Sequence, residues 1–389
     1  MVPLQVDLPV VGIVGGGQLA RMTIQAAISL GVPVRILAER ADDAAAIVSP
    51  NVDLGAPNDP DAVRRFAQGC DVLTFDHELV DVEILEALEA GGQVVYPSAA
   101  TLALGQDKRL QREQFASLGF PVPANKVIAS DGDMIRFGER HGWPFIAKAS
   151  RGGYDGRGVW VVDGPDAARE LLSDTAQLAA PLIVEERVAI EKEIAVLVAR
   201  RPSGDVVSYP AVETVQVEGM CREILAPAPI PPDLATEAQR LARELASAIG
   251  VVGLLAVELF VADGRLVVNE IAVRPHNSGH WTIEGSPTSQ FEQHLRAILD
   301  WPLGQAGMTA PAVATVNILG PDRAGFNLAA HLPDALSVSG AHVHLYGKTP
   351  RPGRKLGHVT ALDEHLPEAL ARARQAASTL VGELMEANA

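Results

Sequence analysis

Short apolar runs alternate with helical stretches through the first hundred residues, and this alternation constrains the fold more than any other feature of the chain. Apolar strands separated by helices are typical of a parallel β-sheet with crossover helices. One helix is predicted at Gln18–Leu30, with Gly31 as its natural end. The predicted strands are Val10–Val14, Val32–Ala38, Asp71–Phe75 and Val94–Tyr96. We therefore expect an α/β domain over residues 1–104.

A smaller second domain is predicted over residues 105–184. It starts with a helix at Lys108–Leu118, which Gly119 and Pro121 close. A glycine-rich loop follows later in this segment, and apolar runs flank it on both sides. The runs that predict strands here are Phe145–Ala149, Val159–Val162 and Leu182–Glu186.

The remainder, residues 185–389, predicts a mixed α+β domain with a small β-rich tail. A hairpin is expected over Leu254–Ala272, because Asp263-Gly264 is a strong two-residue turn signal. The other predicted strands are Glu193–Ala199, Ala312–Leu319, Ala341–Tyr346 and Lys355–Leu362, and the predicted helices are Asp233–Ile249 and His365–Met385.

Composition limits the classes of partner. A chain of 389 residues that is 48% hydrophobic can form two or three cores, and its net charge of −16 disfavours nucleic acid and anionic membranes as partners. The two cysteines, Cys70 and Cys221, lie far apart and suggest neither disulfides nor zinc. The N-terminus has no basic stretch before its apolar run, and no apolar run reaches the length of a membrane span. We expect a cytoplasmic protein.

The turn Gly15–Ala20 matches G-x-G-x-x-A after a strand, and Glu39 ends the next strand about 20 residues on. Taken alone, this pattern indicates a nicotinamide dinucleotide. The alternative is a general anion site, since amide groups at a helix N-terminus hold any phosphate. The second interpretation is favoured because the motif is common and its context is shared by many folds.

The segment 142–162 carries stronger chemistry, since a strand with Lys148 leads into a loop with four glycines at 152, 153, 156 and 158. Glycines allow backbone amides to approach an anion closely, and a lysine on a strand supplies a positive charge. The spacing is not that of a Walker loop. The alternative is a plain hairpin turn at 153–156 with Lys148 solvated at a strand end, which four glycines and nearby cations make less plausible.

Two carboxylates on the predicted hairpin indicate a metal site. Glu258 interrupts an otherwise apolar strand face, and a buried carboxylate needs a counter-charge. A two-residue turn would place Glu258 opposite Asn269, whereas a three-residue loop would place it opposite Glu270. Both registers gather oxygen ligands, which suit Mg²⁺ bound together with substrate phosphates. The alternative is an exposed hairpin face paired with arginines, although adjacent carboxylates repel without a cation.

A run of hydrogen-bond donors, Arg274-Pro275-His276-Asn277-Ser278-Gly279-His280-Trp281, follows the hairpin directly. Loops on rigid scaffolds are where ligand contacts gather. A single histidine is more often structural, and Trp281 favours packing. Arginine, histidine, asparagine and serine together beside a metal hairpin favour a substrate site.

Several of these segments together resemble the ATP-grasp ligases: Lys148 with GGYDGRG at 152–158, EERV at 185–188 with Glu193, Glu258, and NE at 269–270 followed by RPHNSGHWT. Within that superfamily, GGGQLARM at 15–22, RPHNSGHW at 274–281 and YGK…RPGRKLGHV at 346–359 resemble the N5-carboxyaminoimidazole ribonucleotide synthetases. The resemblance covers nearly the whole chain.

The resemblance implies an N-terminal Rossmann-like domain, a central lid domain and a C-terminal ATP-grasp domain. It also implies ATP- and bicarbonate-dependent carboxylation of 5-aminoimidazole ribonucleotide through carboxyphosphate, in purine synthesis, by a cytoplasmic homodimer that uses Mg²⁺. Glu258 and Glu270 would bind the metal, and Tyr154, Asp155 and Arg274 would serve catalysis. The implied ATP contacts are Lys108, Lys148, Gly153, Tyr154, Asp155, Gly156, Arg157, Gly158, Glu185, Glu186, Arg187, Val188, Glu193, Gln216, Asn269 and Glu270. The implied substrate contacts are Gln18, Leu19, Glu78, Tyr154, Asp155, Arg274, His276, Asn277, Ser278, Lys348, Arg354 and Lys355.

Two positions depart from the family pattern. Where the family usually has Y-E-F-E-N, the chain reads Phe75-Asp76-His77-Glu78-Leu79, so Asp76 shortens one side chain. Gln216 stands where a histidine is usual. The rival interpretations are a formate-dependent glycinamide ribonucleotide transformylase, biotin carboxylase, and a nucleotide-binding module without catalysis. The density of the cluster Arg274–His280 argues against the last of these.

Overall fold

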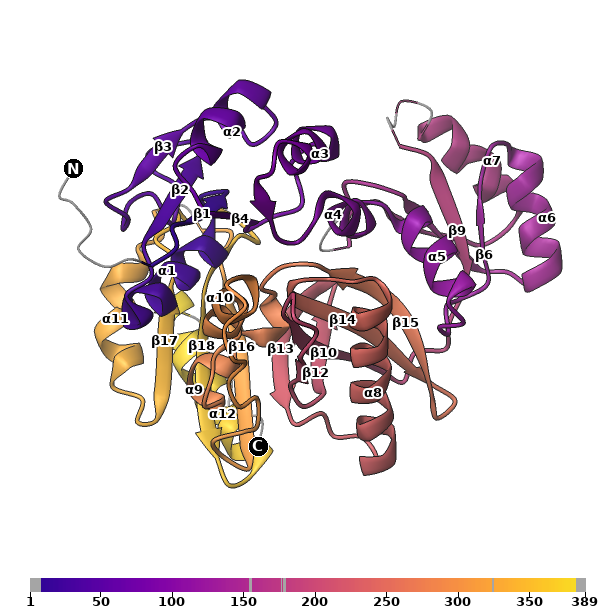
Figure 1. The fold of residues 1–389 in the computed structure, drawn as a ribbon. Helices are drawn as coiled ribbons and strands as arrows, with labels where there is room; N and C mark the ends of the chain where they lie inside the picture. Colours follow the sequence, from indigo (N-terminus) through magenta and orange to yellow (C-terminus); the bar gives the residue numbers. More distant parts are fainter. Residues whose placement is uncertain (1–7, 154–155, 176, 178–179, 324, 383–389) are drawn as a thin grey trace.

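The computed structural model describes residues 8–153, 156–175, 177, 180–323 and 325–382. Three β-sheets organise the described chain, with five, four and nine strands. In Figure 1 the first sheet lies at the upper left, the four-stranded sheet projects to the right, and the large sheet runs along the bottom. The α/β and α+β architecture predicted from the sequence is confirmed.

The N-terminal sheet is parallel, with strand order β3-β2-β1-β4-β5. The central strand β1 is buried along its whole length, and so is β4, which explains why Thr74 is the one polar residue in these two strands. The edge strand β3 was not predicted, because it is three residues long and partly exposed. The strands are β1 Val11–Val14, β2 Val34–Ala38, β3 Val52–Leu54, β4 Val72–Phe75 and β5 Val94–Val95.

Helix α1 spans Gln18–Leu30, as predicted, and ends at Gly31, whose φ of 68° is left-handed. Helices α2 (Pro60–Ala67) and α3 (Val82–Ala90) also connect strands of this sheet. A buried hydrogen bond of 2.8 Å between Thr74 Oγ1 and His294 Nε2 is one of the contacts that join this domain to the rest of the chain.

The central unit has an antiparallel sheet with order β6-β9-β7-β8. Its core joins strands β7 and β9 to two helices that were not predicted. The strands are β6 Asn125–Val127, β7 Phe145–Ala149, β8 Val159–Val162 and β9 Leu182–Glu186, and the helices are α6 Asp131–His141 and α7 Pro165–Asp174. Helices α4 (Ala99–Gln106) and α5 (Lys108–Ser117) lead from the first sheet to this unit (Figure 1).

The largest sheet is antiparallel and follows the order β15-β14-β10-β12-β13-β16-β18-β17, with β11 paired to β10. Helix α8 packs over its β10, β11 and β14 strands, whereas helix α12 packs over β16 and β18. The strands are β10 Lys192–Arg200, β11 Val206–Ser208, β12 Val212–Val217, β13 Met220–Ala226, β14 Gly253–Ala262, β15 Arg265–Ala272, β16 Ala312–Leu319, β17 Ala341–Leu345 and β18 Lys355–Asp363. The helices are α8 Pro232–Ala248, α9 Thr282–Gly285, α10 Gln290–Ile298, α11 Leu328–Leu336 and α12 Leu366–Val381, with a 3₁₀ turn at Asn277–Gly279.

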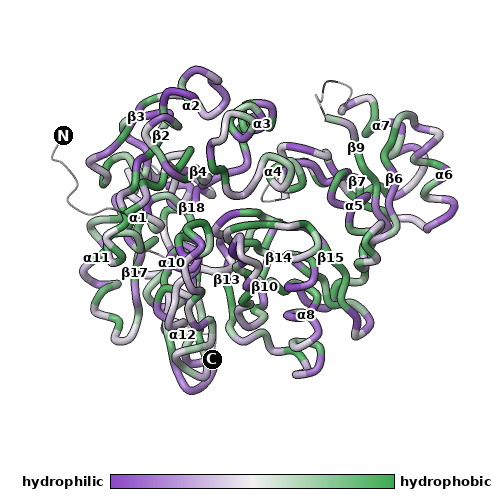
Figure 2. Tube along the Cα trace, viewed as in Figure 1, coloured by the Kyte–Doolittle hydropathy of each residue, from purple (hydrophilic) through white to green (hydrophobic). Residues whose placement is uncertain are grey.

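Apolar segments lie along the strands inside each unit, whereas polar segments lie on outer helices and turns (Figure 2). The last predicted helix, His365–Met385, is shorter than expected, and its final residues lie outside the described range. Among the described residues, no helix combines the length and the apolar character needed to cross a bilayer.

Candidate active site

The predicted hairpin is present, and a β-bulge sets which residues face one another. The turn Asp263-Gly264 has two residues, since Ala262 pairs with Arg265. A regular ladder from this turn would place Glu258 opposite Asn269. A bulge between Glu258 and Leu259 shifts the register by one residue, so that Glu258 lies opposite Glu270 and Asn269 is the extra residue. The register predicted for a three-residue loop is therefore right, but the bulge produces it.

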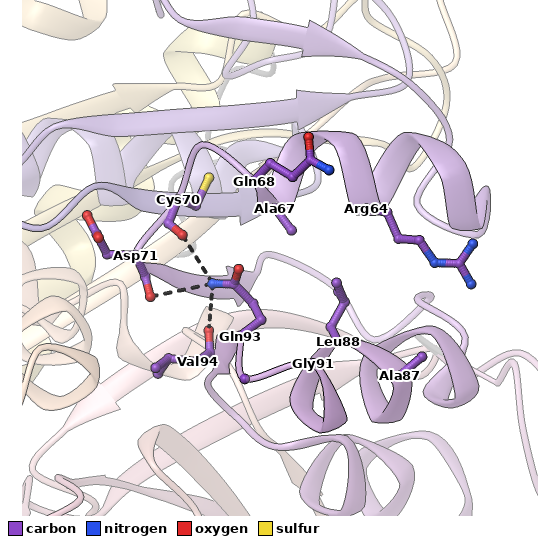
Figure 3. Close-up of a pocket in the computed structure, with 11 residues that line it drawn as sticks. Arg64, Ala67, Gln68, Cys70, Asp71, Ala87, Leu88, Gly91, Gln93 and Val94 are labelled. Atoms are coloured by element: carbon purple, nitrogen blue, oxygen red, sulfur yellow. Dashed lines mark hydrogen bonds between the residues drawn. The ribbon is translucent and has the colours of Figure 1, made fainter.

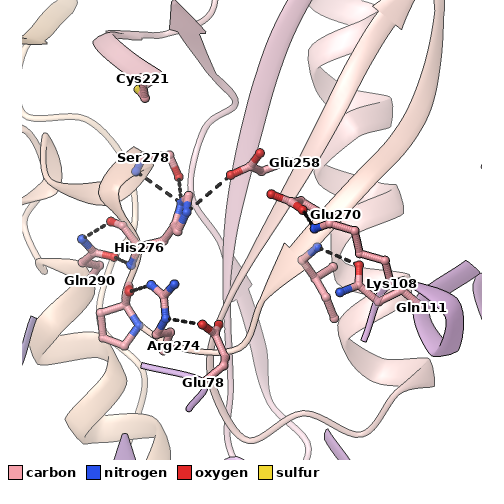
Figure 4. Close-up of polar contacts among 12 residues, drawn as sticks. Glu78, Lys108, Gln111, Cys221, Glu258, Glu270, Arg274, His276, Ser278 and Gln290 are labelled. Carbon is pink, nitrogen blue, oxygen red and sulfur yellow. Dashed lines mark hydrogen bonds and ion pairs between the residues drawn. The ribbon is translucent and has the colours of Figure 1, made fainter. Parts of the chain in front are cut away.

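The two hairpin carboxylates differ in their electrostatic environment. Burial, and then the negative charges of Glu270 and Glu193, raise the pKa of Glu258 to about 8. Burial also acts to raise the pKa of Glu270, but the charges of Lys108 and Lys148 outweigh it and hold that pKa below the ordinary value. The Lys108 ammonium, from helix α5, forms an ion pair with Glu270 (Figure 4). A site of this kind favours an added cation.

Lys148 on β7 is not solvated, in contrast to the alternative considered for it. Its residue is 8% exposed, and its Nζ lies 2.7 Å from Glu185 Oε2 and 3.3 Å from Asn269 Oδ1. Glu185 accepts a second contact, of 2.6 Å, from Arg112 Nε. Both oxygens of the Glu185 carboxylate therefore contact cations inside the protein.

The strand end after Glu185 contributes less to this network. Glu186 Oε1 accepts a hydrogen bond of 3.0 Å from the Ala124 amide, and Arg187 is exposed. Val188 is partly buried. Burial, and then the charge of Glu270, raise the pKa of Glu193, which places Glu193 in the electrostatic neighbourhood of the hairpin. No described contact joins Gln216, at the bulge of β12, to these groups.

The glycine-rich loop between β7 and β8 has the backbone that its sequence predicts. Gly152, Gly156 and Gly158 have φ values of 76°, 77° and 73°, which residues with a side chain rarely adopt. A Cβ on Gly156 would lie 3.1 Å from the Cα of Gly219, in the β12–β13 turn. The loop thus approaches another segment backbone to backbone. Tyr154 and Asp155, predicted for catalysis, lie outside the described residues.

The loop after β15 gathers the predicted substrate residues. Arg274 Nε lies 2.8 Å from Glu78 Oε2, which joins this loop to the end of β4. His276 Nε2 lies 3.4 Å from Glu258 Oε1, and its Nδ1 lies 2.9 Å from Ser278 Oγ (Figure 4). Burial, and then the charge of Arg274, lower the pKa of His276 to about 3, so its ring is neutral. Asn277 starts the 3₁₀ turn.

Asp76, noted only as a departure from a pattern, occupies the turn at the start of helix α1. Its Oδ2 accepts a 2.5 Å hydrogen bond from the Gly17 amide. A Cβ on Gly15 would lie 1.8 Å from Asp76 Oδ1, so the glycine makes room for this carboxylate. The protein's own anion therefore fills the position at which a dinucleotide would place its pyrophosphate. A dinucleotide interpretation of Gly15–Ala20 does not fit this arrangement.

A second group of cations lies beside the same turn. Lys348 Nζ bonds Gln18 Oε1 at 2.5 Å, across 330 positions of sequence. Burial, and then the charge of Arg354, lower the pKa of Lys348 to about 8. Arg354 donates to the Thr349 carbonyl at 3.1 Å, and Lys355 begins β18. Leu19 is buried in a small cluster with Tyr346, between the two segments.

A hollow of about 480 Å³ lies elsewhere, between helices α2 and α3 (Figure 3). Asp71 and Val94, which line it, precede and begin strands β4 and β5, so it sits at the edge opposite the Gly15–Gly17 turn. Of its eleven lining residues only Arg64 and Asp71 carry charge at neutral pH, and Gln93 Nε2 is used by main-chain carbonyls. The polar network of Figure 4 is the better candidate because it gathers opposed charges.

Comparison with known proteins identifies the family of the chain. Three family models match: the ribonucleotide synthetase preATP-grasp domain at 8–106, the ATP-grasp domain at 113–291, and the phosphoribosylaminoimidazole carboxylase C-terminal domain at 313–372. The chain is 50% identical to the N5-carboxyaminoimidazole ribonucleotide synthase of Mycobacterium tuberculosis, covering 96% of this chain and 88% of that protein. The corresponding figures for the Corynebacterium ammoniagenes enzyme are 43%, 96% and 92%.

Solved structures agree. A Thermus thermophilus N5-carboxyaminoimidazole ribonucleotide synthetase has a TM-score of 0.86 at 38% identity, over 96% of this chain and 99% of that one. An Aspergillus clavatus synthase, in complex with ADP and 5-aminoimidazole ribonucleotide, has a TM-score of 0.87 at 32% identity, over the same shares. The predicted enzyme class, an ATP-grasp ligase that uses ATP, is confirmed. The chain belongs to the N5-carboxyaminoimidazole ribonucleotide synthase family.

Proposed function

We propose that this chain carboxylates the exocyclic amine of 5-aminoimidazole ribonucleotide, with ATP and bicarbonate, in purine biosynthesis. One observation carries the proposal. The hairpin carboxylates Glu258 and Glu270 contact, through His276 and Lys108, both the loop after β15 and helix α5. The groups that we propose to bind the nucleotide and the substrate therefore meet at one pair of carboxylates.

The nucleotide phosphates would lie against the lysines. Lys108 and Lys148 approach the hairpin from α5 and β7, so their ammonium groups converge on Glu270 and Asn269. The glycine loop after Lys148 would close over the phosphates with its amide groups. The segment Glu185–Val188 would hold the base through main-chain groups, and Glu193 would accept hydrogen bonds from ribose hydroxyls. Gly153, Arg157 and Gln216 remain proposed ATP contacts on the family resemblance.

The residues fit a magnesium ion shared with ATP. Glu258 and Glu270 face each other, and Asn269 adds an amide oxygen on the bulge. Within the described parts of the chain, no three His, Cys, Asp or Glu side chains group closely enough to hold a metal by themselves. Two carboxylates are what Mg²⁺ needs when phosphates and water complete its six ligands. The bound ion would neutralise charge that develops on phosphate oxygens.

The aminoimidazole ribonucleotide would occupy the side of the hairpin that faces the N-terminal domain. Lys348, Arg354 and Lys355 form a cationic group beside α1, and together with Gln18 they would hold its phosphate. The ion pair of Glu78 with Arg274, and the neutral His276 ring, would line its imidazole and ribose. Leu19, Asn277 and Ser278 complete the proposed contacts.

The chemistry needs bicarbonate oxygen to attack the γ-phosphoryl group in line, which gives carboxyphosphate and ADP. Lys108 and Lys148 stabilise the charge that develops on the transferred phosphoryl oxygens. Carboxyphosphate then breaks its C–O bond to release CO₂ and phosphate, and the substrate amine adds to CO₂ and loses a proton. Closure of the loop excludes water during this interval. We assign the amine's proton to Asp155, beside Tyr154, with Arg274 as the cation that orients the substrate.

The test is ADP release, measured with each candidate substrate in turn. We expect 5-aminoimidazole ribonucleotide with bicarbonate to stimulate ADP release strongly. Glycinamide ribonucleotide with formate should not stimulate ADP release, and this result would exclude the transformylase. A biotin carrier protein should not stimulate it either, and this result would exclude biotin carboxylase. Stimulation by formate and glycinamide ribonucleotide alone would overturn the assignment. A nucleotide-binding module without catalysis would release no ADP under any of these conditions.

Domains, assembly and location extend the proposal. We propose three domains, at residues 1–104, 105–184 and 185–389. We also propose that the chain forms a homodimer and that it acts in the cytoplasm. The chain has only two cysteines, far apart in the sequence, which suits a reducing compartment, and the net charge of −16 fits a protein without nucleic-acid or membrane partners. Sedimentation or light scattering at micromolar concentration tests the dimer, and a monomer there would refute it.

A further inference from the structure

Arg112, inside helix α5, is one of the most deeply buried charges in the protein. It is 1% exposed and follows Lys108 by one helical turn, so both side chains leave the same face of α5. Its Nε donates to Glu185 Oε1 at 2.6 Å. Its two terminal nitrogens are buried and have no hydrogen-bond partner among the described residues. Buried charged groups usually have all their donors in hydrogen bonds, so a buried guanidinium with two unpaired nitrogens needs an explanation.

The charges around Glu185 supply that explanation. Arg112 meets one oxygen of the Glu185 carboxylate, and Lys148 meets the other at 2.7 Å. A lysine paired with one carboxylate presents no net charge to a ligand. Two cations that share one carboxylate present a net charge of +1. The buried trio therefore keeps a positive charge at the position where Lys148 faces Asn269 and the hairpin.

The influence of Arg112 also reaches the hairpin. Its charge helps to keep the pKa of Glu270 low, after the larger effects of burial and of Lys108 and Lys148. Around Lys148 itself, burial lowers the pKa most, Glu185 opposes this, and Arg112 lowers it further. Burying three charged groups carries a large desolvation penalty, and apolar residues of similar volume usually stabilise a fold at least as well. The function of the trio is therefore better explained by its net positive charge than by its contribution to stability.

We propose that Arg112 is a positioning residue, which holds the Glu185 carboxylate so that Lys148 carries an uncompensated positive charge toward the nucleotide phosphates. Arg112 itself touches neither nucleotide nor substrate. The inference rests on the proposed role of Lys148 in binding ATP. It does not depend on which ribonucleotide is carboxylated.

The experiment compares Arg112→Met, Arg112→Lys and wild type by binding of a fluorescent ATP analogue with Mg²⁺, in the absence of any ribonucleotide. Loss of one buried charge near phosphates should weaken nucleotide binding on the order of tenfold in Arg112→Met. Arg112→Lys should recover most of the affinity because it restores the charge. KM for 5-aminoimidazole ribonucleotide should stay near the wild-type value. Arg136→Met, an exposed arginine of α6, is the matched control and should bind like wild type.

Equal nucleotide affinity in folded Arg112→Met and wild type would overturn the proposal, as would a loss that Arg112→Lys does not reduce. If Arg112→Met does not fold, Arg112→Lys and Arg112→Gln are compared, since only the lysine keeps the charge. We then expect the lysine variant to bind the nucleotide more tightly by about fivefold or more. Equal affinities would refute the role. Failure of 5-aminoimidazole ribonucleotide to stimulate wild-type ADP release would instead count against the proposed function.

Discussion

Asp76 Oδ2 lies 2.5 Å from the backbone nitrogen of Gly17 and so occupies the amino end of helix α1. The Ala20 amide also stabilises this carboxylate, whose pKa burial nevertheless raises above the ordinary value. A helix amino end is a natural site for an anion, and here the anion belongs to the protein. Asp76 also packs closely against Gly15, where an added Cβ would lie 1.8 Å from its Oδ1.

The first prediction concerns this turn. Wild-type protein should show no saturable NAD binding. Asp76→Ala should lower the free energy of unfolding by about 1 kcal/mol, as loss of a capping side chain does. It should also let inorganic sulfate raise the melting temperature, because the amide donors are released. Asp42→Ala, an exposed residue, is the control. Micromolar NAD affinity in wild type, or equal sulfate stabilisation of both proteins, would show that Asp76 does not fill an anion site.

The second prediction concerns the metal. Glu270→Gln keeps the shape of the side chain but removes one charged ligand, which we expect to cost about 1.5–3 kcal/mol of transition-state stabilisation. Activity should therefore fall at least about tenfold. Steady-state kinetics at several Mg²⁺ concentrations provide the measurement. Glu244→Gln, on the exposed face of α8, should be unaffected. A near-normal kcat at saturating Mg²⁺ would remove Glu270 from the metal site.

The third prediction follows from the pKa of Glu258, which lies near 8 in the metal-free protein against an ordinary value of 4.5. Between these values the folded chain binds more protons than the unfolded chain, so stability should fall as pH rises from about 4.5 to 8. Glu258→Gln, which stays neutral, should be more stable than wild type at pH 8 and similar to it at pH 5. Thermal unfolding at both pH values tests this.

Proton release on metal binding is a second test of the ionisation of Glu258. Because Mg²⁺ binds the ionised carboxylate, Mg-ATP binding near pH 7 should release a proton, which calorimetry in buffers of different ionisation enthalpy detects. Glu258→Gln should lose that release together with activity. If proton release is unchanged in the variant, Glu258 is not the titrating group.

The fourth prediction concerns the glycine-rich loop. Arg151 and Arg157 are exposed, and proteolysis at them should be rapid in free protein and slowed by Mg-ATP. Lys148→Met should weaken the protection. The fold should survive this change, since the Glu185 carboxylate keeps its contact of 2.6 Å with Arg112. If cleavage is slow and its rate does not change when Mg-ATP is added, the segment is a rigid hairpin and not a lid.

Local patterns in the sequence were enough to predict most elements and to single out the candidate site residues. Helix α1 and the hairpin turn at Asp263-Gly264 follow from periodicity and turn chemistry, which act over a few residues. The lysine, the glycine loop and the acidic pair were recognised because their residue types are what phosphates and Mg²⁺ require.

Only the tertiary structure decided how these groups are charged and which of them meet. The bulge that turns Glu258 toward Glu270 depends on pairing along the whole hairpin. Arg112 and Asp76 carry no local signal, because each acquires its role from a partner 73 or 59 positions away in sequence. Burial shifts Glu258 and Lys148 from their ordinary pKa values in ways that composition cannot express. Ionisation depends on the surroundings in space, and folding brings those surroundings from distant parts of the chain.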